Sequence, residues 1–137
     1  MANSVRYRNG EQRIVGIIGD EDTVTGFLLA GVGDNRVMPN QRENPGEGQQ
    51  SGLQPNYYVV TPSTPLSEIE EAFTTMCGRK DIGIIIICQH IANDIRHLVE
   101  EYNTVIPCIL EIPSKGQKYD AEKDFVLEKI TRALGIR

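Results

Sequence analysis

The stretch IVGIIGDEDTVTGFLLAGVG, residues 14–33, decides the fold of this 137-residue chain. It opens with an apolar run, Ile14–Ile18, which is interrupted only by Gly16 and has polar residues on both sides. A short apolar run bounded in this way is typical of a strand buried on both faces of a sheet. The stretch therefore predicts that the domain begins with a buried strand.

An acidic turn and a helix follow this strand. The apolar residues of 23–32 recur at helical spacing, and the preceding Asp20-Glu21-Asp22 suits the positive end of the helix dipole. Asp22 is predicted to cap the helix, and Gly33 is predicted to end it in a left-handed conformation.

The remainder of the chain repeats this alternation. Strands are predicted at 57–60, 82–88 and 105–112, and helices at 65–78, 91–102 and 120–134. Thr64 is predicted to cap the second helix, with Pro65 at its first position. Pro107 lies near the start of the last strand and predicts that this strand is at the edge of the sheet. The expected fold is a single α/β domain with a four-stranded, mostly parallel, doubly wound sheet, helices on both faces and an additional C-terminal helix.

The chain divides into three parts by composition. Residues 1–12 are polar and predict a flexible tail, and 13–115 form the α/β domain. Within that domain, 34–56 is rich in Asn, Gln, Gly and Pro, which predicts a long mobile loop. Residues 116–137 are expected to form a C-terminal helix that docks on a partner.

Charge and cysteine content limit the possible functions. The chain has 14 Lys and Arg against 19 Asp and Glu, a net charge of −5, so it lacks the positive field that attracts nucleic acid or an anionic membrane. Its three cysteines contain no CxxC pair, which indicates buried, reduced thiols in a cytosolic protein. No apolar run approaches the ~20 residues that cross a bilayer, so membrane association is expected only through a partner.

The acidic turn and the histidines argue against catalysis. Three carboxylates repel a phosphate, so the turn is not a nucleotide loop. A receiver-like signalling domain would use such carboxylates and Lys115, but Cys88-Gln89-His90 stands where the phospho-accepting Asp belongs. A zinc site requires three or four ligands that converge, and Cys88, His90 and His97 need not converge, because Cys88 and His90 alternate along an extended segment and His97 lies about two turns along the following helix. We expect no catalytic residue, metal or cofactor, although a flavodoxin-like small-molecule site stays open as a hypothesis.

The last predicted helix is apolar over a wider arc than one surface needs. Its main stripe and its flank together span about 200°, against the ~100° that packs on a single surface. Two interpretations are open, namely that the helix wedges deeply into its own sheet or that it also covers a partner. For the second, the expected partner-binding residues are Phe125, Val126, Leu127, Ile130, Ala133, Leu134 and Ile136.

Four stretches resemble the F subunits of eukaryotic vacuolar-type (V-type) proton ATPases. The stretches are IIGDEDTVTGFLLAGVG at 17–33, DIGIIIICQHIANDIRHLVEEY at 81–102, IPCILEIPSK at 106–115 and YDAEKDFVLEKI at 119–130. They follow the family order over nearly the whole chain outside its first dozen residues and the 34–56 loop. Two departures are the residues Gly116-Gln117-Lys118, where the family is rich in His and Pro, and the unusual length of the loop.

The resemblance implies a non-catalytic component of the central rotor stalk. It implies that the C-terminal helix pairs with the coiled coil of the D subunit, and that other stalk subunits and the catalytic hexamer are nearby. It further implies a peripheral place on the cytoplasmic face of vacuolar or endosomal membranes, or in the cytosol when the complex dissociates. ATP hydrolysis would occur elsewhere in the complex, and the stalk would help couple it to rotation and proton transport.

Overall fold

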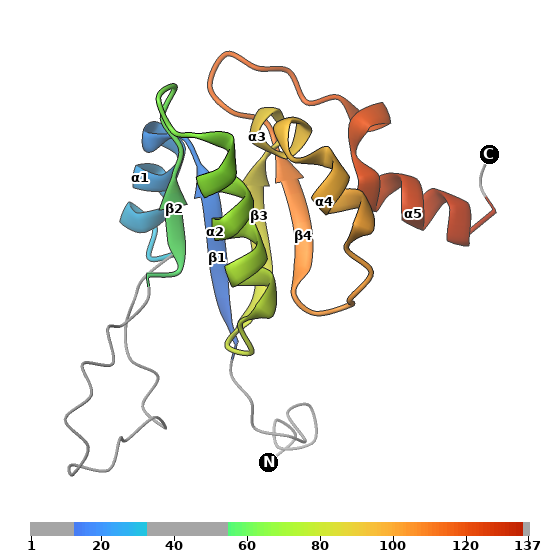
Figure 1. The fold of residues 1–137 in the computed structure, drawn as a ribbon. Coiled ribbons are helices and arrows are strands. Elements are labelled where there is room, and N and C mark those ends of the chain that lie inside the picture. Colours follow the sequence, from blue (N-terminus) through green and yellow to red (C-terminus); the bar gives the residue numbers. More distant parts are fainter. Residues whose placement is uncertain (1–12, 33–54, 136–137) are drawn as a thin grey trace, which may run out of the picture.

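The computed structural model describes residues 13–32 and 55–135 (Figure 1). The predicted tail at 1–12, almost all of the predicted loop at 34–56, the proposed helix stop Gly33 and the proposed partner-binding Ile136 lie outside the described residues.

Four parallel strands form the sheet. They are β1 (Ile14–Gly19), β2 (Tyr57–Val59), β3 (Ile82–Cys88) and β4 (Cys108–Ile112), in the order β2-β1-β3-β4. In the register, Ile18 pairs with Ile87 and Ile85 with Ile109. The predicted edge position of the last strand is confirmed, but the strand begins at Cys108, after Pro107, and not at Val105.

Helices lie on both faces of this sheet, as the predicted fold class requires. Figure 1 shows α2 (Leu66–Gly78) in front of the sheet and α1 (Glu21–Leu29) behind it. The main core lies on the α2 side, where Ile85 and Ile87 of the sheet pack with Phe73 and Met76 of α2. Two short helices, α3 (Gln89–Asp94) and α4 (Arg96–Glu101), cover the same face toward β4. They contribute Ile91 and Val99 to the core, as does Ile95 between them.

The first helix differs from its prediction at both ends. It begins at Glu21, and its cap is Asp20, not Asp22, because the Asp20 carboxylate accepts a hydrogen bond from the Thr23 amide. The helix ends at Leu29, and Gly31 adopts the left-handed conformation with φ 85°. The predicted order of strand, acidic turn and helix is otherwise as observed.

The second and third predicted helices also required correction. α2 begins at Leu66, and Pro65 occupies the cap position with no side-chain hydrogen bond, so the predicted Thr64 cap is wrong. Thr64 instead accepts a hydrogen bond from the Thr61 amide at 2.9 Å. The predicted helix over 91–102 is two helices, because Ile95 leaves the helical region with φ −114° and ψ 31°.

Asn56 belongs to the ordered domain and not to the predicted loop. Only 1% of this residue is exposed, and its Nδ2 donates to the Val15 carbonyl at 3.1 Å. The main-chain carbonyl of Asn56 accepts a hydrogen bond from the Ile17 amide at 3.0 Å. These bonds attach the start of β2 to β1, so the loop prediction is wrong at this residue.

Candidate functional site

The C-terminal helix α5 (Phe125–Ala133) extends sideways from the edge of the sheet (Figure 1). It is shorter than predicted, since a 3-10 turn at Ala121–Lys123 precedes it and Asp124 is its cap. The Asp124 carboxylate accepts from the amides of Val126 and Leu127 at 3.0 and 3.3 Å. An Asp at this position satisfies amide groups that have no partner within the helix, and so defines where the helix begins.

The two sides of α5 have different surroundings. Phe125 and Val126 are half-buried and pack against the core, and Lys129 lies over the Phe125 ring and donates to the Tyr102 carbonyl at 2.9 Å. The opposite side is apolar and exposed, with Leu127 40%, Ile130 50% and Leu134 66% accessible. We call Leu127, Ile130 and Leu134 the outer stripe.

The predicted partner-binding residues therefore divide into two groups. Phe125 and Val126 attach the helix to its own domain, whereas the outer stripe and Ala133 face away from the core. No described residue of α5 is fully buried. The interpretation that this helix wedges deeply into its own sheet is therefore wrong.

Glu111 joins the sheet, α4 and the start of α5 through its hydrogen bonds. Its side chain is fully buried in β4, and its two oxygens accept from the two terminal nitrogens of Arg96 at 3.0 and 2.8 Å. The oxygen Oε2, which accepts one of these bonds, also accepts from the Phe125 amide at 3.2 Å. Bidentate pairs of this kind fix geometry more tightly than single hydrogen bonds. We call Glu111, Arg96 and the Phe125 amide the Glu111 network.

A second set of contacts fixes the segment before α5. The Gln89 side chain donates to the carbonyl of Asp120 and accepts from its amide, both at 2.7 Å. Ser114 and His90 share a hydrogen bond at 2.9 Å. The segment 115–119 is thus fixed at both ends to the first turn of α3.

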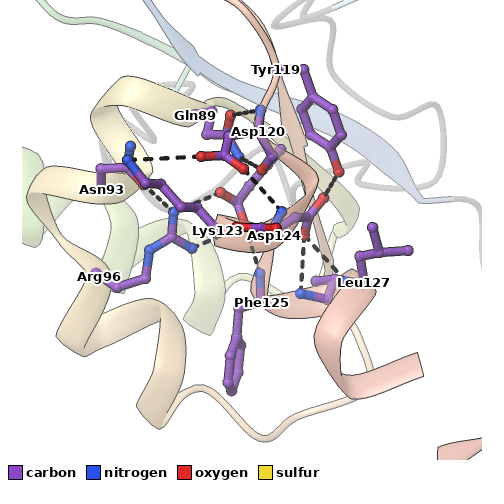
Figure 2. Close-up of polar contacts among 12 residues, drawn as sticks. Gln89, Asn93, Arg96, Tyr119, Asp120, Lys123, Asp124, Phe125 and Leu127 are labelled. Carbon is purple, nitrogen blue, oxygen red and sulfur yellow. Dashed lines mark hydrogen bonds and ion pairs between the residues drawn. The ribbon is translucent and has the colours of Figure 1, made fainter. Parts of the chain in front are cut away.

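Tyr119 completes the start of α5. Its hydroxyl donates to the Asp124 carboxylate, as Figure 2 shows. This hydrogen bond, together with burial and the nearby carboxylates, raises the pKa of Tyr119 to about 12. The neutral phenol is therefore held in place beside the cap.

A polar recess of about 390 Å³ adjoins this segment. It is open to solvent beside the carboxyl end of β3, where doubly wound folds commonly bind ligands. Gln89 and Asp120 line it, but their amide and carbonyl groups already bond to each other. The remaining lining residues are His90, Asn93, Gln117, Lys118, Tyr119, Ala121 and Lys123.

The acidic turn has a structural role in this fold. Asp20 accepts hydrogen bonds from Thr23 and from the Cys88 thiol, and Asp22 forms an exposed ion pair with Lys115 at 3.4 Å. Burial by itself would raise the pKa of Asp20, but these hydrogen bonds outweigh it and lower the pKa. A carboxylate that caps a helix in this way is stabilised by its amide and hydroxyl donors without a metal.

The cysteine and histidines considered as a metal site have separate partners. His90 bonds to Ser114, and His97 lies 3.2 Å from a Glu70 oxygen. Burial raises the pKa of the Cys88 thiol. Within residues 13–32 and 55–135, no group of three His, Cys, Asp or Glu side chains could hold a metal ion.

The sequence alone did not single out Glu111, Arg96 or Gln89. Glu111 did carry a signal, because it is the one charged residue within the apolar stretch CILEI at 108–112. A carboxylate in a buried strand needs a cationic partner, and the partner could have been sought among the basic residues of the preceding helix.

In the part of the chain that the structure describes, no helix is long and apolar enough to cross a lipid bilayer.

Comparison with known proteins places the chain in a family. The family model described as ATP synthase (F/14-kDa) subunit matches residues 15–130. The F subunit of the V-type proton ATPase from Dictyostelium discoideum is 45% identical over 125 residues, covering 91% of this chain and 92% of that protein. The human V-type proton ATPase F subunit is 42% identical over 120 residues, covering 88% of this chain and 89% of that protein.

A solved structure, the F subunit of the V-type ATP synthase from Archaeoglobus fulgidus, has a TM-score of 0.45 and 22% sequence identity, covering 74% of this chain and 98% of that chain. The sequence matches, which are far stronger, decide the assignment. The chain therefore belongs to the family of the ATP synthase (F/14-kDa) subunit, together with the F subunits of V-type proton ATPases.

Proposed function

We propose that this chain is a non-catalytic component of the central rotor stalk of a V-type proton ATPase and that it binds the coiled coil of the D subunit through α5. In this role it helps couple ATP hydrolysis in the catalytic hexamer to rotation of the membrane ring and to proton transport. Other stalk subunits and the catalytic hexamer are its further neighbours. It associates with the membrane only through the complex, as a peripheral component on the cytoplasmic face.

The outer stripe is the observation that carries this proposal. Leu127, Ile130 and Leu134 are spaced three and then four residues apart and remain 40%, 50% and 66% exposed. This is the alternating three- and four-residue spacing of the apolar seam in a coiled coil, where each side chain inserts between side chains of the facing helix. A helical partner therefore fits this surface better than a flat or extended one.

The charges of α5 agree with a single docking side. Glu128 and Arg132 form an ion pair one turn apart. On a helical wheel this pair lies on the side opposite Ile130. The helix thus presents one apolar side and one charged side beyond its attachment to the domain.

The acidic turn supports a non-catalytic role. Asp20, which a receiver domain would use to bind a metal, accepts hydrogen bonds from Thr23 and Cys88 and caps α1. Cys88 lies at the end of β3, where a receiver would carry its phospho-accepting Asp. We therefore favour the stalk component over the receiver-like alternative.

The test is a binding titration of the full chain with the purified cognate D subunit by isothermal calorimetry. Ile130→Asp should raise Kd at least tenfold, because docking would bury a charge where an apolar side chain now lies, at a cost above about 1.4 kcal/mol. Arg132→Asp places the same side chain on the opposite side of α5 and should change Kd far less. Circular dichroism should show both variants folded, since Ile130 is half exposed.

Wild-type affinity in the Ile130→Asp variant would refute the proposed docking side. Failure of the wild-type chain to bind the D subunit at all would refute the proposed partner.

A further inference from the structure

The direction in which α5 leaves the domain depends on few contacts. Among the described residues, Phe125 and Val126 of its first turn pack against the core and Lys129 bonds to the Tyr102 carbonyl, and none of its described residues is fully buried. The helix rises about 1.5 Å per residue, so Leu134 lies roughly 13 Å beyond Phe125. A change of direction of about 20° at the first turn would therefore move Leu134 by about 5 Å, the rise of nearly one helical turn.

Glu111 makes the polar contact that links this first turn to the domain core. Its oxygen Oε2 accepts from Arg96 of α4 at 3.0 Å and from the Phe125 amide of α5 at 3.2 Å. The second oxygen accepts from the other terminal nitrogen of Arg96 at 2.8 Å, which fixes the plane of the carboxylate. The side chain is fully buried, so water does not compete for these bonds.

The neighbouring contacts have a different role. Gln89 and Asp124 fix where the helix begins, because they bond to the main chain of Asp120 and to the amides of Val126 and Leu127. Among the described polar contacts, Glu111 alone ties the Phe125 amide to an element of the sheet.

We infer that Glu111 is a positioning residue, which sets the direction of α5 through Arg96 and the Phe125 amide and so presents the outer stripe to the partner helix. This inference rests on the proposed function, since it concerns how the same surface is presented. Buried ion pairs can often be replaced by apolar residues with little loss of stability, so an orienting role can be separated from a stabilising one.

The test uses a double variant that removes the Glu111 network without leaving a buried charge. Arg96→Met with Glu111→Leu keeps apolar volume at both positions. The matched control is Arg79→Met with Asp81→Leu, which removes another bidentate ion pair, with distances of 3.0 and 2.7 Å, between the end of α2 and the start of β3. Glu111→Gln is the conservative variant, because its amide oxygen can still accept from the Phe125 amide.

Two measurements are made on each full-length variant. Residual dipolar couplings of backbone amides report the direction of α5 relative to the strands, and calorimetry reports Kd for the D subunit. In the wild type one alignment tensor should fit both α5 and the sheet. In the Arg96→Met/Glu111→Leu variant the couplings of the strands should be unchanged, whereas those of α5 should no longer fit the alignment tensor of the sheet. Kd for the D subunit should rise about tenfold if a tenth of the molecules keep the docking direction of α5.

The control pair should match the wild type in both measurements, and Glu111→Gln should lie between the wild type and the double variant. Unchanged α5 couplings in the double variant would overturn the inference, and so would a reoriented α5 with unchanged Kd. These outcomes differ from failure of the proposed function, which would appear as unaltered binding in the Ile130→Asp variant whatever the dipolar couplings show.

Discussion

Replacing Arg96 with Met leaves the carboxylate of Glu111 inside the protein without its cation. The Glu111 side chain is 0% exposed and would retain only the Phe125 amide as a donor. Removing one partner of a buried ion pair costs about 3–5 kcal/mol, because the remaining charge stays desolvated. That is a large share of the roughly 5–15 kcal/mol by which a domain of this size is stable.

Replacing Glu111 with Leu should cost less free energy of unfolding than replacing Arg96 with Met. Arg96 is 20% exposed and also donates to Asn93, so its guanidinium keeps some solvation when Glu111 becomes Leu. We expect a loss of about 1–2 kcal/mol for Glu111→Leu. The Arg96→Met/Glu111→Leu double variant should lie within about 1 kcal/mol of the wild type, because neither charge is then left unpaired.

Urea unfolding followed by far-ultraviolet circular dichroism measures all four free energies of unfolding, and a double-mutant cycle gives the coupling between the two residues. We expect a coupling of at least about 3 kcal/mol and a larger loss for Arg96→Met than for Glu111→Leu. A loss below about 1 kcal/mol for Arg96→Met, or losses that simply add in the double variant, would refute the reasoning, because the carboxylate would then not depend on its cation.

Two further predictions concern the start of α5 and the core. The difference between near-ultraviolet titrations of the wild type and Tyr119→Phe should show a phenol with a pKa of about 12, against 10.0 for an ordinary Tyr. Because the pKa of Tyr119 is raised in the folded protein, the stabilisation from Tyr119 is complete below pH 10.0 and is lost as the pH rises through about 12. A titration midpoint of the Tyr119 phenol near 10.0 would contradict the hydrogen bond to Asp124. Phe73→Ala should lower the free energy of unfolding by about 3–5 kcal/mol, as calorimetric melting can measure, since Phe73 is 3% exposed and packs edge-on against Tyr102. A loss near zero would place Phe73 outside the core.

The strands were predictable because their pattern is local. Ile82–Cys88 has no polar side chain, and it pairs with both β1 and β4 in the middle of the sheet, as such a run predicts, although Ile84 stays 37% exposed. The edge position of β4 was correctly predicted from Pro107, but β4 begins one residue later, at Cys108, so the missing amide hydrogen of Pro107 is not what places the strand at the edge.

Helix ends and breaks were less predictable because several residues could serve equally well. Aspartate is a common capping residue, so Asp20 and Asp22 were both candidates, and the choice of Asp20 depends on where β1 ends in three dimensions. The break at Ile95 was hidden because Ile91, Ile95 and Leu98 keep helical spacing through it. Apolar periodicity records which side chains reach the core, and not whether the backbone between them is continuous.

The exposed apolar side of α5 could be expected from the sequence, but its anchoring could not. Leu127, Ile130 and Leu134 were among the seven residues expected to bind a partner, and the structure leaves their side chains exposed; that they bind a partner stays a prediction. The Glu111 network joins residues 96, 111 and 125, which are brought together only by the crossover from β3 to β4 and the turn that follows. Contacts of this kind depend on tertiary placement, for which a single sequence carries little information.

The segment 116–118, which leaves out Tyr119 and its hydrogen bond to the Asp124 carboxylate, offers a site for inserting a short epitope or fluorophore tag into the chain. Both flanks are tied to adjacent residues of α3, through Ser114 with His90 at 2.9 Å and Asp120 with Gln89 at 2.7 Å. Among the ion pairs of residues 13–32 and 55–135, the one next to an insertion there is Lys115 with Asp22, which is highly exposed and contributes little. Doubling the length of such a loop costs only about 0.6 kcal/mol in closure entropy. A reporter placed there would leave the start of α5 where it is, so the position of the protein in an assembly could be followed without altering the proposed docking surface.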